Sequence, residues 1–161
     1  MKRSIIRWYI AKIKPRMETK IKEYLDSAGI ENFRPTQMPD TLFVRATEEA
    51  VFSLLKNSGL TMNFQYNPVS HQLQTIPDKQ MADFVLLQKH SEELLFLPEP
   101  ENLHGGEKVR VVGGEYSGVE GEIYRIKGHK RVVVRLGNLG AIALGEYVAK
   151  ENLRLKKYEV K

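Results

Sequence analysis

Hydrophobic and polar residues alternate along some short segments of this chain and recur every three or four residues in others. Residues 7–14 alternate as a strand does, with Trp8 and Ile10 on one face and Tyr9 and Ala11 on the other. A helix is predicted to follow from Pro15 and to end at Gly29, because its apolar residues recur at helical intervals: Met17, Ile21, Leu25 and Ala28.

The same two periods continue to about residue 90. Residues 41–46 predict a second core strand, and Thr47 is placed to cap a helix that ends at Gly59. Residues 62–66 and 71–76 predict two further strands, the second irregular, and a third helix starts at Asp78. With a short extended segment at residues 30–35, the predicted order is β-α-β-β-α-β-β-α. This order indicates an α/β sandwich with one antiparallel sheet.

The C-terminal third is rich in glycine and in β-branched residues. Val109, Val111, Val132 and Val134 alternate with polar residues, and Gly128-His129 supplies a short hairpin connection. Further strands are predicted at 141–144 and 152–155. Five short strands in so few residues are typical of a small SH3-like β-barrel, so the expected fold class is α+β.

A proline-rich segment separates the two parts. Residues 94–97 (LLFL) precede Pro98-Glu99-Pro100, which is stiff and extended. We expect domains at residues 1–92 and 105–161 with a linker at 93–104. The apolar run at 94–97 extends the third helix or packs on the first domain, or else it forms a free hook; the first two readings are favoured.

The net charge of +5 lies entirely in the C-terminal part. Residues 105–161 hold 12 Lys/Arg and 7 Asp/Glu, whereas residues 1–104 hold 13 of each. An excess of this kind suits an anionic partner such as nucleic acid or a ribosome, although small excesses are also common on solvated surfaces.

Several classes of protein are disfavoured. The chain has no apolar run long enough to span a membrane, and its basic N-terminus lacks the uninterrupted apolar stretch of a secretory signal. It has no cysteine, its histidines are scattered, and its glycines do not form a phosphate-binding loop. We expect a soluble, cytoplasmic, monomeric binding protein that is not an enzyme and uses no cofactor or metal.

The glycine-rich segment also carries a specific motif. The pattern G-x-x-V-x-V-x-x-G-x-Y-x-G-x-x-G-x-I runs from Gly106 to Ile123 and resembles the KOW motif of NusG-type transcription factors and some ribosomal proteins. The N-terminal order resembles the NGN domain that precedes KOW in NusG-type factors. The segments that carry this second resemblance are Trp8-Tyr9, Lys14-Pro15, Lys20 to Gly29, Phe33-x-Pro35, Pro39-x-x-Leu42-Phe43-Val44-Arg45 and Ile76-Pro77-Asp78.

The resemblance implies a transcription elongation or antitermination factor. In that family the NGN domain binds the clamp helices of RNA polymerase, and the KOW domain recruits a ribosomal protein, a termination factor or nucleic acid. The implied polymerase-binding residues form an exposed apolar patch: Trp8, Ile10, Met38, Thr41, Phe43, Phe64 and Tyr66. Each strand offers two faces, so the same residues could instead form the domain core.

Other residues are weaker candidates. Lys12, Lys14 and Arg16 could contact DNA phosphates, or could form a solvated edge. The loop 136–140 would present Leu136, Asn138 and Leu139 to a KOW partner. Six cations of the C-terminal part could form a nucleic-acid surface, or could be surface charge without a role: Arg110, Arg125, Arg131, Arg135, Lys108 and Lys130. The alternative function is that of a ribosome- or RNA-associated KOW protein.

Two features refine the resemblance. The segment between Phe33 and Leu42 is short, and Thr41 stands where the family often has an aromatic residue. In both features the chain is more similar to specialised NusG paralogues of the RfaH-like branch. Some of these refold KOW as a helical hairpin. Here residues 105–161 hold ten of the twelve glycines and the run Val132-Val133-Val134. Both oppose a helix, so we expect strands.

Overall fold

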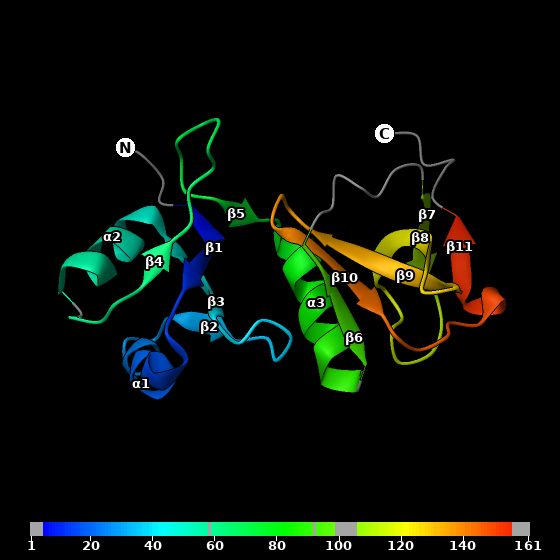
Figure 1. The fold of residues 1–161 in the computed structure, drawn as a ribbon, viewed down its shortest axis with the longest axis horizontal. Helices are drawn as coiled ribbons and strands as arrows, with labels where there is room; N and C mark the ends of the chain where they lie inside the picture. The colour runs from blue at the N-terminus through cyan, green and yellow to red at the C-terminus, as the bar shows by residue number, and fades with distance from the viewer. Residues whose placement is uncertain (1–4, 58, 92, 99–105, 156–161) are drawn as a thin grey trace. The chain divides into compact units, whose positions relative to one another are not determined.

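The chain is a mixed α+β protein with antiparallel sheets. The computed structural model describes residues 5–57, 59–91, 93–98 and 106–155. The chain divides into two compact units, residues 1–78 and 79–161, and each contains one sheet (Figure 1).

The first unit is built on a five-stranded sheet. Strand β1 (Ile6–Lys12) lies in the middle and pairs along its whole length with β3 (Thr41–Thr47). The short strands β4 (Asn63–Phe64) and β5 (Thr75–Ile76) pair with the other edge of β1, and β2 (Glu31–Phe33) pairs with the free edge of β3. All of these pairs are antiparallel, as the hydrophobic pattern predicts.

The helices of this unit begin close to where the sequence predicts them. A single 3-10 turn (Pro15–Met17) leads into α1 (Glu18–Ser27), because proline at the first position suits a helix start. Helix α2 (Glu48–Asn57) is capped as predicted: the Thr47 hydroxyl oxygen accepts a hydrogen bond of 3.1 Å from the Ala50 N–H.

Helices α1 and α2 pack on one face of the sheet, and both lie on the same side of β1 and β3 in Figure 1. The strand residues of this core are those of one parity, so side chains from alternate positions meet the apolar stripes of the helices. The buried core consists of Tyr9, Ala11, Ile13, Ile21, Leu25, Leu42, Val44, Ala46, Val51, Leu54, Met62 and Phe64.

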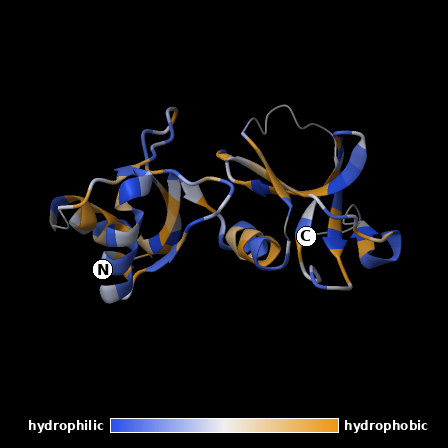
Figure 2. Cartoon of the chain, turned by 60° about the horizontal axis from the view of Figure 1, so that its bottom comes forward, coloured by the Kyte–Doolittle hydropathy of each residue, from blue (hydrophilic) through white to orange (hydrophobic). Residues whose placement is uncertain are grey.

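In its described residues, the second unit contains one α-helix and a six-stranded antiparallel sheet. Helix α3 (Asp78–His90) belongs to it except for its first residue. The strands follow the spatial order β11-β7-β8-β9-β10-β6. Their bounds are β6 (Leu94–Leu97), β7 (Glu107–Val111), β8 (Glu120–Ile126), β9 (His129–Leu136), β10 (Gly140–Leu144) and β11 (Leu153–Leu155), with a 3-10 turn at Lys150–Asn152. Figure 2 shows hydrophobic residues recurring along the strands of both sheets.

Two expectations about the middle of the chain differ from the structure. The domain boundary was placed after residue 92, whereas the compact units divide at residue 78 and α3 belongs to the second unit. Residues 94–97 were assigned to a linker, but they form β6 and pair with β10, with Leu97 opposite Ala141. Residues 94–97 form a strand because β10, whose residues are all buried, needs a partner on its outer edge. Residues 99–105 of the expected linker lie outside the described part.

The glycines of the predicted motif have structural roles. Gly114 and Gly118 have φ angles of 80° and 98°, which side-chain-bearing residues rarely adopt. Gly121 lies in β8 where a Cβ atom would stand 2.5 Å from the Val133 carbonyl oxygen of the neighbouring strand. Only a hydrogen atom fits at that position.

We therefore expect Gly121→Ala to destabilise the second unit by about 1–3 kcal/mol, because the strands must move apart to admit a methyl group. Hydrogen exchange of β8 and β9 amides in the full chain measures this effect. Ser117→Ala, at an exposed turn position nearby, is the control and should leave exchange unchanged. Equal protection in Gly121→Ala and wild type would contradict the close approach.

Candidate functional site

The pairing of β1 with β3 brings large side chains together on the sheet face opposite α1 and α2. Ile10 lies directly opposite Phe43, and Trp8 pairs with Ile76 of β5. Thr41 shares the parity of Phe43. We call Trp8, Ile10, Thr41 and Phe43 the Trp8 face; none of them belongs to the core that α1 and α2 cover.

The expected exposure of this face is wrong. Trp8 is 7% exposed, and Ile10, Thr41 and Phe43 are each 0% exposed. Met38, in the loop before β3, is 4% exposed, and its carbonyl oxygen accepts a hydrogen bond of 3.0 Å from the Thr41 N–H. An apolar face of this size is costly to leave in water, and in the structure its side chains are buried.

The face is apolar in the middle and charged at both ends. At the end nearest Thr41, the Lys12 ammonium donates 2.9 Å to the Thr41 hydroxyl and lies 3.7 Å from the Asp40 carboxylate. At the other end, Arg45 lies 3.8 Å from Glu31 and 3.7 Å from Asp78. Phe33 stacks beside Phe43, with ring centroids 6.3 Å apart. An apolar centre with a polar rim is the usual anatomy of a protein-binding surface.

Two other predicted polymerase-binding residues do not belong to this face. Phe64 pairs with Ala11 and packs into the core beneath α1 and α2, so the interpretation of Phe64 as a core residue was the right one. Tyr66 lies beyond β4, forms an isolated bridge with Leu73, and is 52% exposed. The two residues therefore have different surroundings from those of Trp8 and Phe43.

The three predicted phosphate-binding cations follow one another at the end of β1. Lys14 and Arg16 are exposed. Lys12 is half-buried and engaged with Thr41 and Asp40. Only the two exposed residues are presented to a ligand in this structure.

The predicted partner loop of the second unit is partly closed. Leu136 is fully buried, so its prediction as a partner-binding side chain is wrong: it ends β9 and faces the interior. Asn138 is exposed and Leu139 is half-buried, which corrects the expectation that Leu139 would be exposed. The Gly137 N–H donates 2.6 Å to the Gln80 side-chain oxygen, so α3 fixes one side of this loop.

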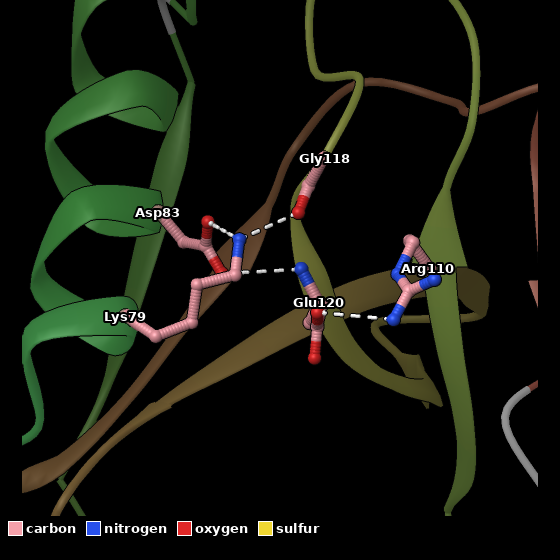
Figure 3. Close-up of polar contacts among 5 residues, drawn as sticks. All are labelled: Lys79, Asp83, Arg110, Gly118 and Glu120. Carbon is pink, nitrogen blue, oxygen red and sulfur yellow. Dashed lines mark hydrogen bonds and ion pairs between the residues drawn. The ribbon is translucent and has the colours of Figure 1, made fainter. Parts of the chain in front are cut away.

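A buried carboxylate joins α3 to the second sheet (Figure 3). Asp83 is 3% exposed; one of its oxygens accepts 2.7 Å from the Lys79 ammonium, and the other accepts 3.1 Å from the Glu120 N–H. Lys79 also donates 2.6 Å to the Gly118 carbonyl oxygen, and Glu120 pairs with Arg110 at 3.3 Å. Because a buried charge is costly without partners, these contacts hold α3 in one position on the sheet.

A second polar cluster holds the C-terminal end of α3. The Glu146 carboxylate accepts 2.7 Å from the Ser91 hydroxyl and 2.9 Å from the Tyr116 hydroxyl. The His90 ring packs edge-on against Tyr116. Burial, followed by the hydrogen bond to Glu146, raises the pKa of Tyr116 from 10.0 to about 12.

Sequence reasoning missed both clusters. In the sequence, Lys79 and Asp83 form an i, i+4 pair of the kind found on solvent-exposed helix faces. Nothing in the sequence indicates that they contact residues 118–120. It also offered Arg110 and Arg135 as nucleic-acid contacts, whereas they are ion-paired with Glu120 and with Glu122 at 2.6 Å.

No protein-family model matches the chain, and no curated protein matches it significantly. Among the described residues, no helix has the length and apolarity that crossing a membrane requires. No group of three or more His, Asp or Glu residues in the described ranges is arranged to hold a metal ion.

Removing the buried carboxylate tests the α3 junction. We expect Asp83→Ala to cost about 1–3 kcal/mol, since it leaves the Glu120 N–H without its acceptor and Lys79 without its partner. Urea unfolding and hydrogen exchange at Glu120 measure this loss. Lys79→Ala, whose side chain is half-exposed, should cost less than about 1 kcal/mol. Equal effects of the two variants would contradict a buried anchor.

The raised pKa of Tyr116 predicts a pH dependence. The folded protein holds this proton more tightly than the unfolded chain, so the stabilisation is fully present below about pH 10. It is lost as the pH rises toward about 12. Burial also raises the pKa of Tyr9, so ultraviolet titration should show a late-ionising component that becomes smaller, but does not vanish, in Tyr116→Phe. If Tyr116→Phe leaves the late-ionising component unchanged, the buried hydrogen bond between Tyr116 and Glu146 is absent.

Proposed function

We propose that this chain is a NusG-type transcription elongation or antitermination factor, with an NGN-like first unit and a KOW-containing second unit. The first unit binds the clamp helices of RNA polymerase through the Trp8 face and favours processive transcription. The protein carries out no chemical step; it shifts the polymerase between conformations by binding one of them better than the other.

The observation that carries this proposal is the construction of the Trp8 face. One face of the first sheet already packs on α1 and α2, so the second set of large apolar residues is not needed for that core. Trp8, Ile10 and Phe43 are the kind of aromatic and aliphatic anchors that dominate protein-binding energies. The ion pairs at the two ends of the face supply a polar rim. A partner engages these side chains in a state in which they are accessible.

The remaining predicted contacts take supporting roles. Lys14 and Arg16, exposed beyond the end of β1, contact DNA phosphates near the bound polymerase, where they position the protein without reading sequence. In the second unit, Asn138 and Leu139 remain the loop residues for a ribosomal protein or termination factor.

Membership of the specialised RfaH-like branch is part of the proposal. Thr41 occupies the place of the family's usual aromatic residue, and its hydroxyl receives a hydrogen bond from Lys12 and donates one of 3.2 Å to Asp40. The contact of Thr41 with Lys12 and Asp40 therefore replaces an aromatic side chain at the edge of the Trp8 face. This difference suits a paralogue whose affinity for polymerase differs from that of the general factor.

The alternative function is that of a ribosome- or RNA-associated binding protein. It is favoured by one observation, the placement of the whole positive excess in residues 105–161. In that case the second unit carries the activity and the Trp8 face serves only the stability of the protein.

Neighbouring residues of β3 provide a matched test. Leu42 and Phe43 are both buried but point to opposite faces, so replacing either by alanine creates a comparable cavity. We expect Phe43→Ala to weaken retention of purified RNA polymerase by about 30-fold, as loss of a central anchor does. Leu42→Ala should bind within a few-fold of wild type, and circular dichroism confirms that both variants fold.

Equal loss in the two variants would show that stability, not the face, controls binding. If wild-type protein fails to retain polymerase but sediments with ribosomes, the alternative function replaces the proposal.

A further inference from the structure

Four neighbouring strands of the second sheet turn aliphatic side chains to the same face. Ile123 of β8 lies directly opposite Glu107 of β7 and Val132 of β9. Val109 lies two residues beyond Glu107 on β7 and therefore has the same parity. Leu153 joins this face through the pairing of β11 with β7. The register of the sheet thus gathers these aliphatic side chains on one surface.

A hollow of about 500 Å³ lies over this surface, and we call it the Ile123 groove. Three residues from the segment after β10 also line it: Tyr147, Val148 and Lys150. Val109 and Val132 are almost fully buried and form the floor of the groove. The side chains of its walls are only half-buried: Ile123, Val148 and Leu153. Part of the apolar lining is therefore open to water.

The size and lining of the Ile123 groove match those of a small-molecule site. Such sites have volumes of about 300–1,000 Å³, mainly apolar walls and a few polar groups. Five of the nine lining residues are aliphatic: Val109, Ile123, Val132, Val148 and Leu153. The one aromatic residue in the lining, Tyr147, is 81% exposed and so lies at the rim. Buried walls of this kind favour an alkyl chain over a flat ring.

One cation of the groove comes from the hairpin between β8 and β9. Ile126 pairs with His129. The turn is therefore Lys127-Gly128, one position earlier than the connection predicted from sequence. Lys130 follows as the second residue of β9 and has the parity of Val132, so it lies on the groove side of the sheet.

The rim of the groove carries one positive charge in excess. Its charged residues are Glu107, Lys130 and Lys150, and all three are exposed. Neither lysine side chain has a hydrogen bond or an ion pair with another residue in the described part of the chain. A singly charged anion at the rim balances this excess, whereas a cation would be repelled.

We propose that the Ile123 groove binds a free alkyl carboxylate, with the chain along the aliphatic walls and the carboxylate near Lys130 and Lys150. Ammonium groups bind a carboxylate through charge-assisted hydrogen bonds, and burial of the CH₂ groups supplies the rest of the affinity. This inference goes beyond the proposed function, because the groove uses no residue of the Trp8 face or of the loop 136–140 and needs no polymerase.

Isothermal titration calorimetry of the full chain with hexanoate, octanoate and decanoate, each below its micelle concentration, tests the groove. We expect saturable binding at one site, with an affinity that rises about fourfold for each CH₂ group that is added. In methyl-labelled protein, the resonances of Ile123, Val148 and Leu153 should shift with the same dissociation constant.

Two variants separate the chain contact from the head-group contact. Val148→Ser should weaken octanoate binding about tenfold, because it removes apolar wall. Lys130→Gln should weaken it about two- to fivefold at low salt and leave the binding of octanol, which has the same chain without the charge, unchanged. Lys130 is exposed, so its replacement leaves the fold intact. The matched controls, Val112→Ser and Lys127→Gln, change exposed residues outside the groove lining and should bind as wild type does.

Heat that does not saturate, an affinity that is independent of chain length, or unchanged binding in both groove variants would overturn the proposal. So would sedimentation of the protein with phosphatidylserine vesicles in place of octanoate binding, since the cations would then serve a membrane surface. Because neither polymerase nor nucleic acid is present, these outcomes are independent of the proposed function.

Discussion

The register between β1 and β3 is the constraint on which the first unit depends. Ile10 faces Phe43 across this pair, and Ala11 faces Leu42. A shift of one strand by one residue would turn its side chains to the opposite face, and so put either Trp8 and Ile10 of β1 or Phe43 of β3 against α1 and α2. The register is fixed because Tyr9, Ala11, Leu42 and Val44 together fill the space beneath those helices. Because these residues pack on α1 and α2, Trp8, Ile10 and Phe43 point to the opposite face of the sheet.

A different constraint shapes the second unit. One oxygen of Asp83 accepts from Lys79 of the same helix, and the other accepts from the Glu120 N–H of the sheet, so burial of both oxygens depends on where α3 lies. Such a buried charge adds little net stability but penalises placements of the helix that leave the second oxygen without a donor. Gln80 and Ser91 add contacts on the same helix and just beyond its end, to Gly137 and Glu146.

Local signals in the sequence predicted most of the elements. Short-range preferences that the structure satisfies account for three features: the Thr47 cap, the positive φ of 71° at Gly29, and the order of strands and helices. Alternation placed Trp8 with Ile10 correctly. It failed for Phe64, because β4 is only two residues long and its face is set by pairing with Ala11, which alternation within β4 does not reveal.

Long-range partners account for the other differences. Residues 94–97 are four apolar residues in a row, a pattern that fits a strand as well as a helix end, and the need of β10 for a partner decided between them. Burial of the Trp8 face and of Asp83 likewise depends on segments distant in the sequence. The sequence identified which residues share a face but not whether water reaches them.

The most direct test of the central claim is site-specific photo-crosslinking to RNA polymerase. A photoreactive phenylalanine analogue replaces Phe43 in the full chain, and a second protein carries the same analogue at Tyr9, which points to the α1 and α2 side of the sheet. Crosslinks from position 43 to the polymerase clamp helices, with none from position 9, are the predicted result. Crosslinks from position 43 to another part of the polymerase, or none where position 9 reacts, would contradict the assignment of the Trp8 face.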